Sequence, residues 1–255
     1  MDALTRGGAA RSTARSPFYL LITAAMTCTM FVGFSFTYFG PIARGVYPDV
    51  SPVVHVHGWS FFAWYMLLPL QAALIRARNV AIHRTLGLAS LGLGAVMVAV
   101  GLIVSVVQIH LARAPDGSPF WRFMGLPIFS SWVLFTVFYV EAMRRRRRVE
   151  DHKRLILLAS AVALGAATFR IAVRIAGPGP SVSIVGMLAS VIFPLIAMIN
   201  DRRRAARIHP AFAWGIPGMV LTIAGTFLLG ATPAGDMLAM GLARIGWLLM
   251  PLYAP

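Results

Sequence analysis

Long apolar stretches, separated by short polar connections, run through the chain from Phe18 onward. The core of a bilayer is about 30 Å thick, so a helix needs about 20 predominantly apolar residues to cross it. Seven stretches reach or approach this length. Their expected bounds are Phe18–Phe39, Val53–Ile75, Thr85–Ile109, Leu126–Met143, Leu155–Ile175, Val182–Ile199 and Ala211–Leu229. The pattern predicts an all-α fold, a polytopic membrane helix bundle with seven transmembrane helices.

The C-terminal stretch from Met237 to Met250 is apolar but short, and Arg244 lies in its middle. An arginine at the centre of a bilayer costs at least about 2.5 kcal/mol. We therefore expect a C-terminal interfacial or re-entrant helix in place of an eighth span. The expected division is a basic tail at residues 1–16, a seven-helix transmembrane domain at 17–232 and an outer-surface segment at 233–255.

Composition supports this class and excludes others. Hydrophobic residues make up 58% of the chain and charged residues 12%, which is far more apolar than a water-soluble domain requires. The formal net charge of +15 does not indicate nucleic-acid binding, because the arginines cluster in the connections between apolar stretches. The one cysteine, Cys28, lies inside the first stretch, so neither a disulfide framework nor a thiolate metal site is expected.

The distribution of Lys and Arg predicts the orientation in the membrane. Most of them fall in the N-terminal tail and in alternate connections, whereas the other side carries only Arg44, Arg113, Arg122 and Arg244. Cytoplasmic connections are the ones enriched in Lys and Arg. We expect a cytoplasmic N-terminus leading into a retained anchor, a C-terminus outside, and contact between the basic clusters and anionic lipid headgroups at the cytoplasmic face.

Several helices carry small residues at a spacing of four, which lets helix backbones approach closely within one chain or between copies of a homo-oligomer. Proline inside a helix is expected to kink it. The small residues are Ser90 and Gly94, Ala95 and Ala99, Ala161 and Gly165, Ala163 and Ala167, and Gly186 and Ser190; the prolines are Pro194 and Pro217.

Three of the predicted cytoplasmic connections share one order of residues. A polar residue leaves a helix, an arginine cluster follows, and a histidine opens the next helix. The pairs of polar residue and histidine are Gln71 with His83, Glu141 with His152, and Asp201 with His209. This order suggests three helix hairpins in addition to the first helix.

Polar side chains within membrane helices are costly and are candidates for function. At 100° per residue, three pairs share a helix face, and the first pair is separated by about 21 Å along the axis. These pairs are His57 with Gln71, His83 with Gln108, and His152 with Arg170. If the three faces meet, they form one polar site near each end of the bundle.

The predicted outer site contains His57, Gln108, Arg170 and Arg174. The predicted inner site contains Gln71, His83, Glu141 and His152, with Asp201 and His209 as further members. Glu141 has an alternative interpretation, in which it turns to the arginine run beside it. His55 is expected to be a solvated neighbour of His57, and His110 is expected on the face opposite Gln108.

The first functional hypothesis is redox chemistry. A b-type haem in a helix bundle needs axial histidines from facing helices and basic residues for its propionates. His83 and His152 would supply such a pair at the inner site. At the outer site, His57 with Arg170 or Arg174 would suit a haem propionate or a quinone oxygen.

This layout resembles cytochrome b561-like and ferric-reductase-type bundles, which carry histidines at two depths. The second to fifth predicted helices also resemble poorly characterised bacterial multi-pass proteins with a histidine-glycine span entry and an HRxxG turn, here His57-Gly58 and His83 to Gly87. The resemblance implies a protein of the bacterial inner (plasma) membrane with haem b. The chain departs from b561 because its histidines lie at helix ends, and no second ligand is evident at the outer position.

Two other classes of function stay open. A zinc-dependent membrane hydrolase acting on lipid would use three histidines and a carboxylate, for which the candidates are His83, His152, His209 and Glu141. Seven-span hydrolases of the ceramidase type also carry an HxxxH pair near the last span, which this chain lacks. A transporter or assembly factor without a cofactor would use the proline-containing helices as moving parts.

Overall fold

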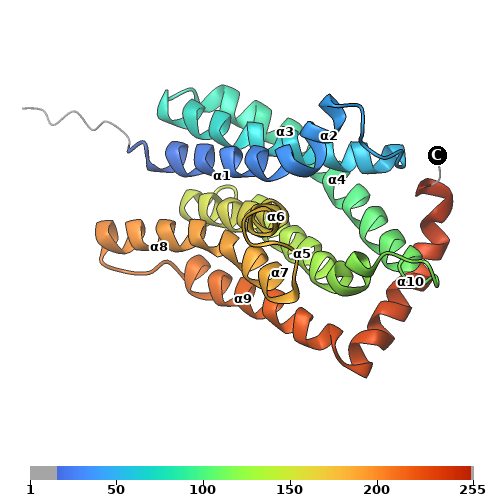
Figure 1. The fold of residues 1–255 in the computed structure, drawn as a ribbon. Coiled ribbons are helices and arrows are strands. Elements are labelled where there is room, and N and C mark those ends of the chain that lie inside the picture. Colours follow the sequence, from blue (N-terminus) through green and yellow to red (C-terminus); the bar gives the residue numbers. More distant parts are fainter. Residues whose placement is uncertain (1–15, 254–255) are drawn as a thin grey trace, which may run out of the picture.

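The structure, a computed structural model, describes residues 16–253, and these residues form helices and their connections without a β-strand. Figure 1 shows a bundle of long helices with the last helix, α10, crossing one end. The elements are α1 (Phe18–Phe34), the π-helix η1 (Ser35–Phe39), α2 (Gly40–Ala43), α3 (Pro52–Arg76), α4 (Val80–Leu111), α5 (Pro119–Arg144), α6 (Val149–Ala176), α7 (Pro180–Leu188), the 3₁₀-helix η2 (Ala189–Val191), α8 (Ile192–Ala205), α9 (Pro210–Gly230) and α10 (Pro233–Tyr253).

Seven segments of the described chain are long and apolar enough to cross a membrane. The first combines α1, η1 and α2, and the sixth combines α7, η2 and α8. The predicted all-α bundle of seven spans is confirmed, and the chain is an integral, multi-pass membrane protein. Residues 1–15, which make up most of the predicted cytoplasmic tail, lie outside the described residues.

Proline and polar caps explain where many of these helices begin. Five helices start with proline, whose missing N–H costs nothing in the first turn: α3, α5, α7, α9 and α10. The Oγ of Ser51 accepts a hydrogen bond from the backbone of Val53 at the start of α3, over 3.3 Å. The prediction of a short fourth helix from Leu126 was wrong, because α5 already begins at Pro119 and continues through Pro127.

Helix α6 is the centre of the bundle. It packs against α1, α5, α7 and α9, and 56% of its apolar window is buried, the largest share among the seven spans. Ser160 on α6 receives two aromatic side chains from α3: Trp64 Nε1 donates to its Oγ over 3.1 Å, and the Tyr65 hydroxyl donates to its carbonyl over 2.6 Å. The first helix and the hairpins α3–α4, α5–α6 and α8–α9 are thus assembled around one helix.

Small residues allow the close approach that the sequence predicted. A Cβ added to Gly33 of α1 would lie 2.5 Å from the carbonyl oxygen of Ala167 on α6, and one added to Gly186 of α7 would lie 2.8 Å from Cα of Phe169. Gly94 of α4 lies under the ring of Tyr139, with its prospective Cβ 2.3 Å from the hydroxyl. These contacts form within one chain.

Two irregular turns interrupt the spans. The 3₁₀ turn η2 contains Ser190, whose carbonyl would be the α-helical acceptor for residue 194. Pro194 has no N–H to donate, and its ring crowds that carbonyl. The proline therefore explains why the α-helix is interrupted at η2. Pro217 lies within α9, which stays one continuous α-helix. The π-helix η1 was not predicted.

We name the ends of the bundle by their helices. The α1 end is where α1 begins, and the α10 end is where α10 crosses the bundle (Figure 1). Helix α10 packs chiefly against α4 and is not among the seven candidate spans, in agreement with the expected C-terminal interfacial or re-entrant helix.

Candidate functional site

Arg170 of α6 is held at the α10 end by the π-helix of the first span. Its Nε donates to Oγ1 of Thr37 over 2.8 Å, and its Nη1 donates to the carbonyl of Ala166 over 2.7 Å. The guanidinium also lies 4.3 Å from the ring centroid of Phe34, a cation–π distance. The irregular turn η1 therefore brings a hydroxyl to a half-buried positive charge. π-Helical turns often occur at functional sites.

His57 faces the same region from the first turns of α3. Its Nδ1 is buried and has no hydrogen-bond partner among the described residues. The ring lies 4.8 Å from that of Phe61, and the imidazole is within electrostatic range of Arg170. A buried polar atom without a hydrogen-bond partner lowers the stability of the fold by about 1–3 kcal/mol. The unpaired Nδ1 of His57 therefore needs a specific explanation.

The connection between α2 and α3 closes over this region with tyrosine. The ring of Tyr47 lies 5.1 Å from that of Tyr38. Burial raises the pKa of Tyr47, and the positive charge of Arg170 lowers it in part. The Tyr38 hydroxyl lies 2.9 Å from Nδ1 of His55. His55 is therefore bound to the first span and is not the solvated neighbour that was expected.

The remaining members of the predicted outer site have other partners. Gln108 Nε2 donates to the hydroxyl of Tyr253 on α10 over 2.6 Å. Burial raises the pKa of Tyr253, and this hydrogen bond lowers it in part. Arg174 is exposed, with its guanidinium 5.8 Å from the ring centroid of Phe36. The structure thus brings together His57 and Arg170 and assigns Gln108 to the packing of α10.

At the α1 end, the predicted pairing of Gln71 with His83 is present. With the Gln71 amide oriented by its neighbours, its nitrogen donates to Nδ1 of His83 over 2.6 Å, and its oxygen accepts from the backbone N–H of Gly87 over 3.2 Å. His152 lies within electrostatic range of His83, and its Nδ1 lies 2.9 Å from the carbonyl of Ala142. Both imidazoles are therefore held through Nδ1.

The other predicted members of the inner site have different partners. Glu141 pairs with Arg145 in the arginine run beside it, as its alternative interpretation supposed. His209 Nε2 lies 3.3 Å from Oδ1 of Asp151. Among residues 16–253, no three His, Cys, Asp or Glu side chains are grouped so as to hold a metal ion. The proposed zinc ligands His83, His152, His209 and Glu141 are thus not assembled as one set.

A buried ion pair at the α1 end was missed by the sequence analysis. Arg154 Nε donates to Oδ2 of Asp201 over 2.5 Å, and its Nη1 donates to Oε2 of Glu150 over 2.7 Å. Tyr19 of α1 lies within electrostatic range of the pair, and its buried hydroxyl has no partner in the described chain. Arg154 had been assigned to the cytoplasmic cluster because the apolar stretch begins at Leu155, but α6 starts earlier.

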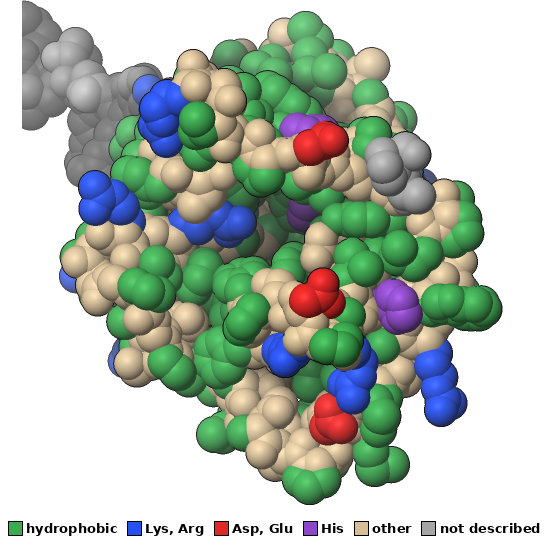
Figure 2. Space-filling model, turned by 45° about the vertical axis from the view of Figure 1, so that its right-hand side comes forward, with side chains coloured by type: hydrophobic (Ala, Val, Ile, Leu, Met, Phe, Trp, Pro, Cys, Tyr) green, Lys and Arg blue, Asp and Glu red, His purple; other side chains and the backbone are tan. Residues whose placement is uncertain are grey.

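Two hollows of about 270 and 220 Å³ lie along α5, α9 and α10. No histidine lines either of them, so neither is a haem pocket with histidine ligands. In Figure 2, the face that includes the α10 end is hollowed near its centre, and a histidine and basic side chains are visible there.

Comparisons with protein-family models, with curated proteins and with solved structures find no match.

Proposed function

We propose that this integral membrane protein binds a membrane-soluble quinone between His57 and Arg170 and serves quinone-linked electron transfer. One observation carries the proposal: Nδ1 of His57 is buried and has no hydrogen-bond partner among residues 16–253. The imidazole lies within electrostatic range of a guanidinium that is fixed by Thr37 and by a backbone carbonyl. A bound ligand oxygen would satisfy this nitrogen and use the positive charge.

The chemistry of a quinone suits these two groups. Its carbonyl oxygen accepts a hydrogen bond from an imidazole N–H, and it gains negative charge as the ring is reduced. A fixed guanidinium stabilises charge that develops on such an oxygen. The His57 imidazole can offer such a hydrogen bond through its unpaired Nδ1.

The surroundings suit an apolar ring. Phe34 lies 4.3 Å from the Arg170 guanidinium, and Phe61 lies 4.8 Å from the His57 ring. The rings of Phe39 and Phe62 lie in a tilted arrangement with their centroids 4.6 Å apart. Binding sites for small apolar molecules combine such walls with a few polar groups that fix orientation.

The remaining expectations are proposals of the same kind. The arginine clusters at the α1 end favour a cytoplasmic N-terminus, which places the quinone site at the outer side of a bacterial inner membrane. His83 and His152 stay candidate ligands of haem b by resemblance alone. The quinone site does not depend on them. The described geometry supplies no ligand set for a zinc hydrolase.

Quinone content tests this function. The full chain, purified in mild detergent, is extracted with organic solvent, and its quinones are quantified by chromatography. We expect quinone to co-purify with the wild type and with His110→Ala, and to be lost from His57→Ala. The control changes a histidine that lies outside this site, and alanine keeps the Cβ that faces α10. Absence of quinone from the wild type, or equal content in both variants, would overturn the proposal.

A further inference from the structure

The two hollows along α5 and α9 are the two parts of a second candidate binding site, and neither His57 nor Arg170 lines them. The first hollow, about 270 Å³, lies at the α10 end among the end of α4, the start of α5 and the start of α10. The second, about 220 Å³, continues between α5 and α9. Leu126 lines both hollows, so the two are adjacent along α5.

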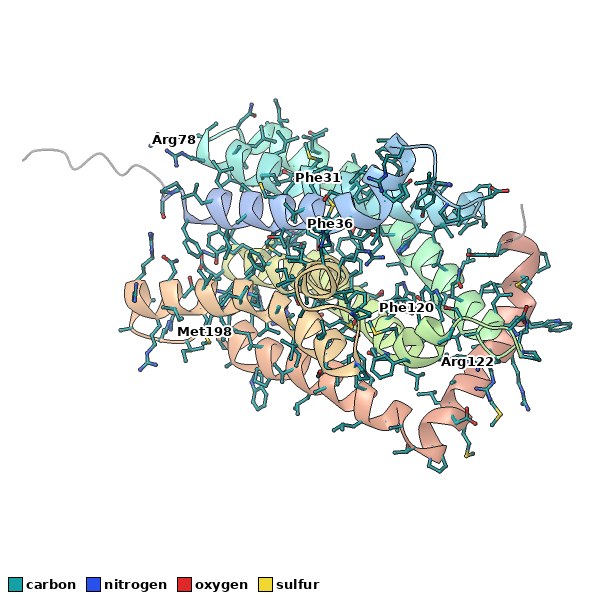
Figure 3. The ribbon with its side chains drawn as sticks, in the orientation of Figure 1. Phe31, Phe36, Arg78, Phe120, Arg122 and Met198 are labelled. Atoms are coloured by element: carbon teal, nitrogen blue, oxygen red, sulfur yellow. The ribbon has the colours of Figure 1, made fainter. Side chains whose placement is uncertain are left out.

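The first hollow carries a positive charge that no carboxylate offsets. Arg113 is paired with Asp236 over 2.9 Å. Arg122 instead donates from Nε to the carbonyl of Ala112 over 2.7 Å and from Nη2 to that of Ala114 over 2.6 Å. These carbonyls hold the guanidinium in place beside α10 (Figure 3) without neutralising it. Within the described residues Arg122 has no acidic partner, so the hollow suits an anion.

The second hollow suits hydrocarbon. Its lining is apolar apart from Ser130, Thr222 and Thr226. The Oγ of Ser130 lies 3.1 Å from Oγ1 of Thr226. Ser130 also donates to the carbonyl of Pro127, and Thr226 to that of Thr222. Because these two hydroxyls are already satisfied, an acyl chain can lie against them without stranding a polar group.

The length of the groove matches one leaflet. From Leu126 to Val137, α5 rises by about 16 Å at 1.5 Å per residue, which is about half of a hydrocarbon core of about 30 Å. A chain that starts at the charged hollow therefore ends near the middle of the bilayer. A headgroup at Arg122 and an acyl chain along α5 fit the two hollows in the correct order.

We infer that this site binds an anionic phospholipid, with its phosphate at Arg122 and one acyl chain in the groove between α5 and α9. The inference does not rest on quinone binding. Free phosphate would leave the apolar groove without a role. In a zwitterionic lipid the headgroup cation would offset the phosphate charge that Arg122 attracts.

Lipid retention measured by native mass spectrometry of the full chain tests this inference. The detergent-solubilised protein is offered phosphatidylglycerol and phosphatidylcholine together. We expect the wild type to retain phosphatidylglycerol preferentially. Arg122→Gln should reduce that retention by about tenfold or more, because a charge-assisted contact is lost. Val133→Trp should reduce it similarly by filling the groove. The matched controls Arg244→Gln and Leu221→Trp change an arginine and an exposed apolar residue that line neither hollow, and they should retain lipid.

Arg122→Gln also removes contacts within the α4–α5 connection, so Val133→Trp provides an independent test that leaves this connection intact. Unchanged phosphatidylglycerol retention in Val133→Trp would overturn the inference, as would equal retention of phosphatidylcholine by the wild type. Inorganic phosphate alone is the third probe. If it binds with the same dependence on Arg122 but without dependence on Val133, the site takes free phosphate and not a lipid.

Discussion

Arg154 of α6 and Asp201 of α8 form an ion pair inside the bundle, with Nε 2.5 Å from Oδ2 and side chains that are only 7% and 8% exposed. Glu150, one turn away on α6, adds a second carboxylate at 2.7 Å. The pair ties the central helix to the sixth span near the α1 end. Removing Asp201 is costly because the charge of Arg154 stays buried, and Glu150, whose side chain is 61% exposed, compensates it only in part.

We expect Asp201→Ala to lower the free energy of unfolding by about 3–5 kcal/mol. Glu141→Ala is the control, because it breaks the partly exposed pair with Arg145 and should cost less than about 1 kcal/mol. Denaturant unfolding of both variants in the same detergent measures the difference. Equal, small losses would show that the Arg154–Asp201 pair contributes no more than a surface pair.

Stability should fall at mildly acidic pH through His209. Its Nδ1 accepts the backbone N–H of Ala211 at the start of α9, over 3.2 Å, so the folded state requires a neutral ring. Burial, and then the positive charge of Arg154, lower the pKa of His209 against the opposing carboxylate of Asp151. The folded protein therefore binds fewer protons than the unfolded chain just below the ordinary histidine pKa of about 6.5.

The stability contributed by this group is fully present above about pH 6.5 and is lost as pH falls through the lowered pKa of the folded state. Thermal unfolding between about pH 7.5 and about pH 5 measures the loss. His209→Asn keeps a capping side chain but cannot titrate, so it should show a smaller decline over this range than the wild type. The same decline in both proteins would assign the pH dependence to other groups.

Gly246 should be essential for the close packing of α10 against α4. A Cβ at this position would lie 2.1 Å from the carbonyl oxygen of Val106, whereas one at Gly241 of the same helix meets nothing within 4 Å. Gly246→Ala is expected to cost about 1–3 kcal/mol through overpacking and to speed hydrogen exchange across α10. Gly241→Ala should leave exchange unchanged or slow it, because alanine favours a helix. Identical exchange in the two variants would contradict the close contact.

Much of the fold follows from the sequence because each span must supply its own apolar length. The residues at which the helices begin and end follow less well from the sequence. The start of α5 was misplaced because Trp121, Arg122 and Pro127 lower the apparent length of the apolar stretch, although a helix tolerates all three. Arg154 precedes the apolar stretch but lies inside α6, because the helix begins before that stretch.

The candidate site was only partly predictable. Helical periodicity identifies which residues share a face, and it drew attention to His57 and Arg170. Periodicity does not say which helix that face meets, so it could not show that Gln108 binds Tyr253 across 145 positions of sequence. Nor does any simple pattern indicate the π-helix that places Thr37 against Arg170.

Titration with a short-chain quinone, ubiquinone-1, tests the central claim most directly. The measurement is the affinity of the purified full chain for ubiquinone-1 in wild type, His57→Ala, Arg170→Gln and the double variant. We predict saturable binding by the wild type and a loss of about tenfold or more in each single variant, about 1.4 kcal/mol. The double variant should lose less than the sum, because both groups act on one ligand. No saturable binding by the wild type, or affinity unchanged by both substitutions, would contradict the account.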